Sequence, residues 1–364
     1  MVIGVDGNDA NVTSRVGVGV YIFNLLNYFA KVSTANLQFV VYLKNAPAGS
    51  LPPESEYFRY QVVPGRTLWL SLFLPRAVNK SKNLNVFFSP AHYSPPKIHV
   101  PLVVTIHDLA YFYYPKEFLK RDLYKLKNWT RKSIQNAKKI ICVSKSTKDD
   151  VALFYKTPKD KLVVIYNGYE KDDNNETKPT DFTLSPKSYI LFVSTLQPRK
   201  NIDFLVSSFL KIQQKNPELK LVIVGKKGWL YKKLFKRVKK LKIEDSVLFT
   251  GFVSNPELTY LYKNALCLIH PSLYEGFGIP ILEAMAHDCP VISSNKSSLP
   301  EIGGDAALYF DPTDEDDLVG KYNTLVGDKN LQQALIQKGK ERVSGFSWEK
   351  CASETLDVIK SAAA

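Results

Sequence analysis

The feature that most constrains this sequence is a short apolar run followed by a glycine-containing loop and a helix-forming segment. Residues 265–269 form the apolar run, the loop contains Gly276 and Gly278, and Pro280 stands near the start of the segment 279–286. The apolar run predicts a buried strand, and proline is favoured at the start of a helix. A strand, a glycine loop and a helix together indicate an α/β protein whose loop N–H groups can face an anion.

Two glutamates bracket this loop. Glu275 precedes it, and the pattern places Glu283 in the first turn of the helix, where a carboxylate suits the helix dipole. An ionised carboxylate only accepts hydrogen bonds, so it is also a natural partner for sugar hydroxyls. The segment therefore predicts a nucleotide-sugar site. Plain α/β packing with ordinary helix capping is the alternative that the loop alone leaves open.

Length and composition predict about two soluble domains. The chain has 364 residues, of which 45% are hydrophobic and 23% charged, and no apolar run approaches the ~20 residues that span a bilayer. The start, residues 1–6, favours a strand over a signal peptide. The net charge of +14 suits nucleic acid, anionic lipid or phosphorylated substrates. The four cysteines are scattered without a CxxC pair, which predicts buried free thiols in a reducing cytoplasm.

The first part of the chain predicts a Rossmann-like domain. A strand at 2–6 is followed by Gly17-Val18-Gly19 and a helical pattern with Ile22 and Leu25 on one face. The complete dinucleotide fingerprint GxGxxG is absent, so this turn predicts either close approach of a ligand to the backbone or tight packing alone. Further strands are expected at 38–43, 85–88, 102–106, 139–144 and 163–166, with a loop region at 46–66. The apolar segment 68–74 predicts a core helix, and an exposed, membrane-facing patch is the alternative.

Polar residues follow the predicted strand 102–106. His107 and Asp108 stand where buried parallel strands of α/β proteins end and where such folds bind ligands. A buried structural histidine is the alternative. Residues 116–139 predict a long, basic, amphipathic helix that suits an anionic membrane surface. A solvated charged face over a packed apolar stripe explains the same pattern.

A polar linker at 170–186 separates this series from a second one. Strands are expected at 189–193, 219–224, 247–249 and 290–293, and a second basic helix at 228–242 has no assigned role. Helices through 331–343 and 348–359 close the chain.

Several motifs together resemble glycosyltransferase family 4. The spacing of Glu275 and Glu283 resembles the Glu-x7-Glu signature of that family. Five further motifs occur in the family's order: Gly17-Val18-Gly19, His107-Asp108-Leu109, Asn167-Gly168, Arg199-Lys200-Asn201 and Phe346-Ser347-Trp348. In detail they most resemble the mannosyltransferase-like bacterial branch.

The resemblance implies the GT-B fold, with two facing Rossmann-like domains and an interdomain cleft. The expected parts are an N-terminal acceptor domain at 1–170, a linker at 171–187, a nucleotide-sugar domain at 188–345 and a helix at 346–364 that crosses back. The implied activity is retaining hexosyl transfer by front-face attack, without a metal. GDP-mannose is the expected donor, a UDP-sugar is the alternative, and the acceptor is a glycan or is lipid-linked.

The resemblance also implies the site. His107, Arg199, Lys200 and Glu275 are the expected catalytic residues, with the two basic side chains on the departing diphosphate. His107 and Glu275 would contact the transferred sugar, and Glu283 the ribose hydroxyls. The remaining donor-binding residues are expected to be Gly17, Val18, Gly19, Gly251, Phe252, Val253, Gly276, Phe277, Gly278 and Ile279. No metal site is expected, because Asp172-Asp173 and Asp316-Asp317 stand in polar linker-like or helical contexts.

Three other functional classes are consistent with parts of the sequence. A nucleic-acid-binding protein would use the positive charge, but stacking aromatics are not interleaved with it. A nicotinamide oxidoreductase would need an acidic residue after the second strand, which instead ends Tyr42-Leu43-Lys44. A sugar-nucleotide epimerase or a phosphorylase would share the fold. We expect a cytoplasmic protein, with peripheral attachment to the inner face of the membrane through residues 116–139 left open.

Overall fold

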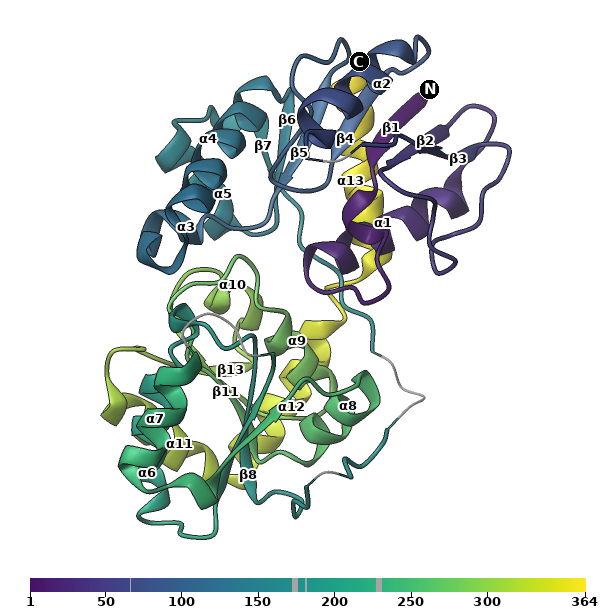
Figure 1. Ribbon diagram of the computed structural model, residues 1–364. Coiled ribbons are helices and arrows are strands. Elements are labelled where there is room, and N and C mark those ends of the chain that lie inside the picture. Colours follow the sequence, from purple (N-terminus) through teal and green to yellow (C-terminus); the bar gives the residue numbers. More distant parts are fainter. Residues whose placement is uncertain (66, 172–175, 181, 227–230) are drawn as a thin grey trace. The chain divides into compact units, whose positions relative to one another are not determined.

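The computed structural model describes residues 1–65, 67–171, 176–180, 182–226 and 231–364 (Figure 1). The chain divides into two compact units. Unit 1 consists of Met1–Gly168 together with Phe346–Ala364, and unit 2 of Tyr169–Gly345. Each unit contains one parallel sheet with helices packed against it.

Unit 1 has a seven-stranded sheet in the order β3-β2-β1-β4-β5-β6-β7. The central strands β4 and β5 are buried along their whole length, which explains their continuous apolar sequence. The strands are β1 Val2–Asp6, β2 Gln38–Leu43, β3 Phe58–Val62, β4 Val86–Ser89, β5 Leu102–Ile106, β6 Lys139–Cys142 and β7 Leu162–Val164.

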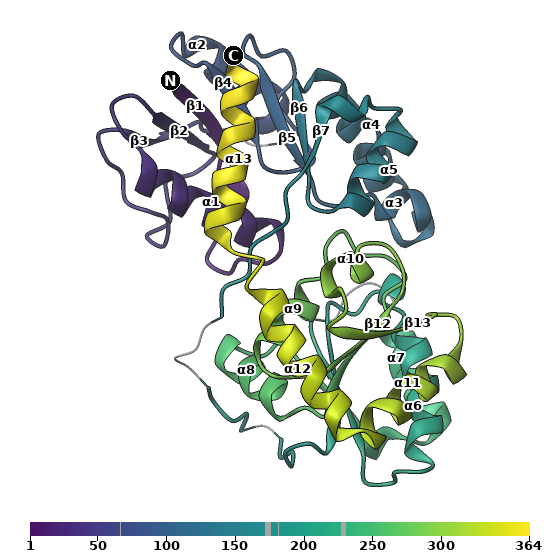
Figure 2. The same cartoon turned by 180° about the vertical axis from the view of Figure 1, so that it is seen from behind.

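The helices of unit 1 cover both faces of this sheet. The C-terminal helix α13 runs along α1 on one face, which Figure 2 shows from behind. The main helices are α1 Val18–Val32, the π-helix η2 Trp69–Phe73, α2 Leu74–Lys80, α3 Ala110–Tyr113, α4 Lys120–Asn136, α5 Lys145–Tyr155 and α13 Trp348–Ala363. Gly17, the N-cap of α1, has a φ of 49°, a backbone conformation that favours glycine.

One expectation for unit 1 was wrong, and another was correct in part. The segment 46–66 contains the edge strand β3 and is not loop alone. The strand was not recognised from sequence because polar Arg59 and Gln61 alternate with aromatic residues in it. The predicted core helix at 68–74 is confirmed in part: η2 and the start of α2 bury Trp69 and Leu74 in the apolar core, whereas Leu68 and Phe73 are exposed. The predicted basic helix is confirmed over Lys120–Asn136 and is preceded by a 3-10 turn at Pro115–Glu117.

Unit 2 has a six-stranded sheet in the order β10-β9-β8-β11-β12-β13. Successive residues of β8 point to opposite faces: Ile190 and Phe192 pack in one apolar cluster, Tyr189 and Leu191 in another. The strands are β8 Tyr189–Val193, β9 Lys220–Val224, β10 Val247–Gly251, β11 Cys267–His270, β12 Val291–Ser294 and β13 Ala307–Phe310. The helices are α6 Ile202–Gln213, α7 Tyr231–Leu241, α8 Asn255–Asn264, α9 Ile279–Ala286, α10 Leu299–Gly303, α11 Glu315–Gly327 and α12 Lys329–Val343.

The sequence pattern did not identify α8, α10, α11 and β13, which are short, polar or interrupted by proline. Residues 228–230 of the predicted basic helix, and the pair Asp172-Asp173, lie outside the described residues. Asp316 and Asp317 lie in the first turn of α11, where their N–H groups donate to the side chain of Asp314. All four cysteines are free and buried, as expected. No helix in the described residues is long and apolar enough to span a membrane.

Candidate active site

The strand order of the unit 2 sheet reverses between β8 and β11, which lie side by side although β9 and β10 come between them in the sequence. Crevices at the carboxyl ends of such strands are where open α/β sheets bind ligands. The segment after β8 carries Arg199 and Lys200, and the segment after β11 carries Glu275. The predicted residues of this unit are therefore adjacent because of strand order, not because of sequence proximity.

A backbone hydrogen bond joins these two loops. The N–H group of Leu273 donates to the carbonyl oxygen of Arg199 at 2.9 Å. The Arg199 guanidinium also donates to the carbonyl oxygen of Tyr274 at 3.2 Å. Asn201, in the left-handed region with φ of 58°, turns the chain from the short helix Pro198–Lys200 into α6. The two basic side chains are thus fixed beside the Glu275 loop.

The carboxylate of Glu275 is surrounded by donors. Its Oε1 lies 2.5 Å from Lys200 Nζ, 2.8 Å from Ser272 Oγ and 3.0 Å from His270 Nε2. Its Oε2 faces Arg199 Nη1 at 3.7 Å. Because a carboxylate cannot donate, Nε2 of His270 carries the proton in this bond. Three donors thus surround Oε1, whereas Oε2 can accept a further hydrogen bond.

Burial and charge act in opposite directions on Glu275. Desolvation of the buried carboxylate raises its pKa, but Lys200, the His270 hydrogen bond and Arg199 together outweigh this and hold the pKa well below its usual range. The group is consequently an anion of low basicity. It is well suited to accept a hydroxyl hydrogen bond and poorly suited to take a proton or to attack carbon.

The glycine loop after Glu275 is held by two serines that follow β12. Ser297 Oγ accepts from the N–H group of Glu275 at 2.8 Å. Ser298 Oγ lies 2.9 Å from the carbonyl oxygen of Glu275 and 2.8 Å from that of Phe277. Gly278 has a φ of 115° and forms the N-cap of α9. These hydrogen bonds connect the loop to the segment that follows β12.

The placement of Glu283 was wrong in one respect. Helix α9 begins at Ile279, so Glu283 lies in the second turn and not the first, where the helix dipole would have acted on it. Its carboxylate instead accepts a hydrogen bond of 2.7 Å from Tyr262 Oη of α8. Burial raises the pKa of Glu283, and the Tyr262 bond opposes that rise.

The residues Gly251, Phe252 and Val253 follow the edge strand β10. Gly251 has a φ of 75° and its carbonyl oxygen accepts from the N–H group of Gly225 at the end of β9. The side chain of Phe252 is 60% exposed, and Lys226 Nζ lies 4.6 Å from its ring centre. These residues lie at the same carboxyl edge as Glu275 but two strands from β8.

In unit 1, His107 lies directly after β5. Its Nε2 is 2.8 Å from the carbonyl oxygen of Pro90, which can only accept, so Nε2 carries the proton and Nδ1 is an acceptor. Burial, assisted by neighbouring His92, lowers the pKa of His107 to about 4. The ring is thus neutral near pH 7. The neighbouring Asp108 accepts from the N–H group of Ala110, the first residue of α3.

The glycine turn of unit 1 belongs to the same sheet edge as His107. Tyr21 of α1 packs edge-on against the His107 ring with centroids 5.0 Å apart. The N–H group of Gly19 already donates to the carbonyl oxygen of Val16, which removes one of the expected ligand donors. A side chain at Gly19 would meet the backbone oxygen of Asp9, so this glycine is required for packing of the turn.

The structure adds site residues that the sequence analysis did not select: His270, Ser272, Ser298, Tyr262 and His92. The sequence indicates these site residues only weakly, because serines and histidines at strand ends are common. The alternation of His270, Ser272 and Glu275 after a buried strand was the one available indication. In the described part of the chain, no group of three or more His, Cys, Asp or Glu residues could hold a metal ion.

Comparison with known proteins agrees with this arrangement. The profile "Glycosyltransferase Family 4" matches residues 16–173, and "Glycosyl transferases group 1" matches residues 174–342. O-antigen chain mannosyltransferase B of Escherichia coli is 30% identical over 76% of this chain and 74% of that protein. An O-antigen chain mannosyltransferase of Salmonella typhimurium is 35% identical over 58% of this chain and 57% of its own.

A further relative and a solved structure are also similar to this chain. The N-acetylgalactosamine-N,N'-diacetylbacillosaminyl-diphospho-undecaprenol 4-alpha-N-acetylgalactosaminyltransferase of Campylobacter jejuni is 29% identical over 59% of this chain and 58% of that protein. Sucrose-phosphate synthase of Thermosynechococcus elongatus superposes with a TM-score of 0.74 at 19% identity, covering 99% of this chain and 98% of that structure. With two parallel Rossmann-like sheets and these relatives, the chain belongs to glycosyltransferase family 4 and is a hexosyltransferase with the GT-B fold.

Proposed function

We propose that this protein transfers a mannosyl group from GDP-mannose to a glycan or lipid-linked acceptor, with retention of the anomeric configuration and without a metal ion. The observation that carries the proposal is the Glu275 carboxylate, fixed beside Arg199 and Lys200 between the ends of β8 and β11. The mannosyl group and the glycan acceptor are taken from the names of the two O-antigen chain mannosyltransferases.

In this proposal, the residues of unit 2 hold the donor. Arg199 and Lys200 neutralise the diphosphate, and N–H groups of the loop 276–278 supply further donors. Lys200 donates to Glu275, and its ammonium group supplies positive charge beside the diphosphate. Glu275 Oε2 accepts from a sugar hydroxyl, and Glu283 accepts from the ribose.

The transfer step follows from the low basicity of Glu275. A carboxylate held by Lys200, Ser272 and His270 is a weak nucleophile and a weak base. The bond between the anomeric carbon and the phosphate oxygen breaks, and its electron pair goes to the phosphate. The acceptor hydroxyl attacks from the same face and passes its proton to that phosphate oxygen. The charge that grows on the diphosphate is stabilised by Arg199 and Lys200.

His107 would contact the transferred sugar through its acceptor nitrogen Nδ1. Because its pKa is lowered to about 4, it would act as a neutral hydrogen-bond acceptor for a hydroxyl near neutral pH. A protonated ring would instead repel the positive charge that develops on the sugar. This role needs no metal, and cationic side chains provide the electrostatic stabilisation that a metal would otherwise supply.

Donor choice is tested by a panel of GDP-mannose, GDP-glucose, UDP-glucose and UDP-galactose, with binding followed by thermal shift and hydrolysis by release of nucleotide. GDP-mannose should give the largest shift and the fastest release. Glu275→Gln should lower release at least 100-fold, whereas Glu218→Gln, an exposed glutamate of the same unit, should leave it unchanged. Preference for a UDP-sugar would overturn the GDP-mannose assignment, and product of inverted configuration would overturn the mechanism.

A further inference from the structure

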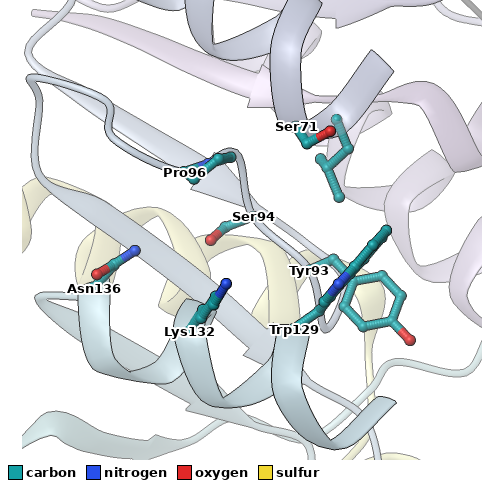
Figure 3. A pocket seen from close by; sticks show the side chains of 8 residues that line it. Ser71, Tyr93, Ser94, Pro96, Trp129, Lys132 and Asn136 are labelled. Atoms are coloured by element: carbon teal, nitrogen blue, oxygen red, sulfur yellow. The ribbon is translucent and has the colours of Figure 1, made fainter. Parts of the chain in front are cut away.

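A pocket of about 150 Å³ lies in unit 1 between η2, the loop after β4 and helix α4 (Figure 3). Tyr93 and Trp129 pack edge-to-face in its wall, with their ring centroids 5.5 Å apart. No carboxylate is among the described residues that line it. Unit 2, by contrast, contains a partly buried carboxylate, that of Glu283. Because a carboxylate selects a ligand by its hydrogen-bond donors, the surroundings of Glu283 bear directly on which ligand binds.

The surroundings of Glu283 differ from those of Glu275. Three donors surround Oε1 of Glu275, among them the cation Lys200. Glu283 receives one neutral donor, the hydroxyl of Tyr262, whose Oη lies 2.7 Å from Oε2. In the described part of the chain, no ion pair includes Glu283 and no hydrogen bond reaches its Oε1. A partly buried carboxylate oxygen that lacks a donor is stabilised when a ligand supplies one.

Tyr262 is held firmly relative to helix α9. Its side chain is buried in the apolar cluster that contains Ile281 of that helix. Its ring stacks on the ring of His287, with centroids 5.8 Å apart and an interplanar angle of 8°. Nδ1 of His287 lies 2.7 Å from the carbonyl oxygen of Glu283, so the stacked ring is bonded to the backbone of the residue that Tyr262 contacts. The Tyr262 hydroxyl therefore has a fixed position beside Glu283.

The hydrogen bond between Tyr262 and Glu283 has one direction. Burial and the charge of Glu283 raise the pKa of Tyr262 well above its usual range, so the hydroxyl keeps its proton and donates. The same bond opposes the rise that burial causes in the pKa of Glu283, and thus favours the ionised carboxylate. With Oε2 held by this bond, the direction of Oε1 is set as well. A side chain that is ordered before binding loses less entropy when the ligand arrives.

A carboxylate oxygen with no cation beside it is suited to a neutral donor, such as a hydroxyl, and repels a phosphate. We propose that Tyr262 is a positioning residue that makes the nucleotide site selective for ribose: by holding Oε2 of Glu283, it directs Oε1 to one ribose hydroxyl. The assignment of this hydroxyl to the ribose rests on the proposed function. Tyr262 acts through Glu283 and does not itself touch the nucleotide.

The test is calorimetric titration of the full chain with GDP, 2′-deoxy-GDP and 3′-deoxy-GDP. The wild type should bind at least one deoxynucleotide about tenfold more weakly than GDP, because a charged acceptor then loses its donor. Tyr262→Phe removes the hydroxyl and keeps the buried ring. It should weaken GDP binding about tenfold but change the binding of that deoxynucleotide less than about twofold. A purely structural role of Tyr262 would weaken both nucleotides by the same factor.

Tyr189→Phe is the matched control. Tyr189 is buried in the same apolar cluster, and its hydroxyl donates to the carbonyl oxygen of Leu261 at 2.7 Å. Its loss should leave the ratio of GDP to deoxynucleotide affinity within about twofold of the wild type. Glu283→Gln should itself weaken GDP binding, and adding Tyr262→Phe to it should have less than about a twofold further effect. Melting temperatures of all variants separate loss of binding from loss of the fold.

An unchanged affinity ratio in folded Tyr262→Phe would overturn the role of Tyr262 and leave the proposed function in place. Equal binding of all three nucleotides by the wild type would overturn the inference at the ribose itself. Titration with UDP and its deoxy forms keeps the test independent of the donor base. Selectivity for ribose that depends on Tyr262 with UDP but not GDP would support the inference and remove the GDP-mannose assignment. Absence of binding by both nucleotides would overturn the inference and the proposed function together.

Discussion

Glu275 is the residue whose environment determines the chemistry of unit 2. Its Oε1 receives Lys200, Ser272 and His270, and these donors compensate for the burial of a charge. Removing one member of a buried ion pair leaves the other charge without compensation, whereas replacing both can cost little. The ion pair of Glu275 and Lys200 therefore affects stability, and this effect can be measured separately from its role in transfer.

We predict that Lys200→Met will destabilise the protein by about 3 kcal/mol, because it leaves the Glu275 carboxylate buried without its closest cation. The double variant Lys200→Met with Glu275→Leu should recover most of this loss but none of the transfer activity. Urea denaturation and nucleotide release measure the two effects separately. Equal stability of the single variant and the wild type would show that Lys200 does not compensate Glu275.

The neutral His107 should make stability depend on pH. Its pKa is about 4 in the folded protein and ~6.5 in the unfolded chain, so only the unfolded chain is protonated between these values. Stability is therefore lost as the pH falls from 6.5 towards 4. We predict that the wild type loses about 2 kcal/mol more than His107→Asn between pH 7 and pH 5. Denaturation at both pH values checks this, since other titrating groups cancel in the comparison; equal losses would contradict a neutral His107.

Sequence analysis identified the site residues that stand in short motifs of recognisable spacing. It missed the residues whose role depends on their position in the folded sheet. Arg199, Lys200 and Glu275 stand in recognisable short motifs. His270 and Ser298 gain their roles from the position of β11 and β12 in the sheet, which no local pattern encodes. The first-turn placement of Glu283 failed because Gly278 sets the start of α9, and a helix boundary is uncertain by one or two residues from sequence alone.

At the level of elements, the conformation of the loop before α9 depends on one glycine. Gly278 has a φ of 115°, and a side chain there would also meet Leu299 Cδ2 at 2.9 Å. We predict that Gly278→Ala costs about 1–3 kcal/mol and weakens donor binding by moving the loop. Gly320→Ala is the matched control: it lies inside α11 with open space around it and should stabilise the protein by about 0.5–1 kcal/mol. Unchanged donor affinity in a destabilised Gly278→Ala would show that the loop does not bind the donor.

The prediction of membrane attachment depends on helix α4. Its basic surface adjoins exposed Leu119, Tyr124 and Trp129, a combination that suits an anionic bilayer. We predict binding to phosphatidylglycerol-containing vesicles that falls with added salt and is at least tenfold weaker in Lys120→Glu with Arg121→Glu. Co-sedimentation measures this, with Lys82→Glu as the matched control. Binding to neutral phosphatidylcholine vesicles at the same level would contradict an electrostatic contact.

The elements that sequence predicted well are those with continuous apolar content. Strands β5, β8 and β9 are buried on both faces and stand out as apolar runs. The edge strand β3 alternates polar and aromatic residues and was missed. Whether a segment of alternating polar residues forms a strand depends on the neighbouring strand with which it pairs. The sequence of the segment alone does not predict that pairing.

At the scale of the molecule, the last helix completes the first unit. Five residues of α13 are buried in the apolar cluster that contains α1: Cys351, Ala352, Leu356, Ile359 and Ala362. The chain leaves unit 1 at Gly168 and returns beside it, since a side chain at Gly168 would overlap the backbone of Trp348. Unit 1 is therefore built from both ends of the sequence, and unit 2 from one continuous segment.

This arrangement predicts unequal consequences of truncation. A chain ending at Gly345 should lose the native structure of unit 1, because α1 would expose the surface that α13 covers, while unit 2 should remain folded. Hydrogen exchange would show this as fast exchange in β1, β4 and β5 with protection kept in β8 and β11. In the full chain, Leu356→Ala should cost about 2–5 kcal/mol, whereas Leu153→Ala, on the exposed face of α5, should stay within about 0.5 kcal/mol of the wild type. Wild-type protection of β1 in the truncated chain would mean that unit 1 folds without its C-terminal helix.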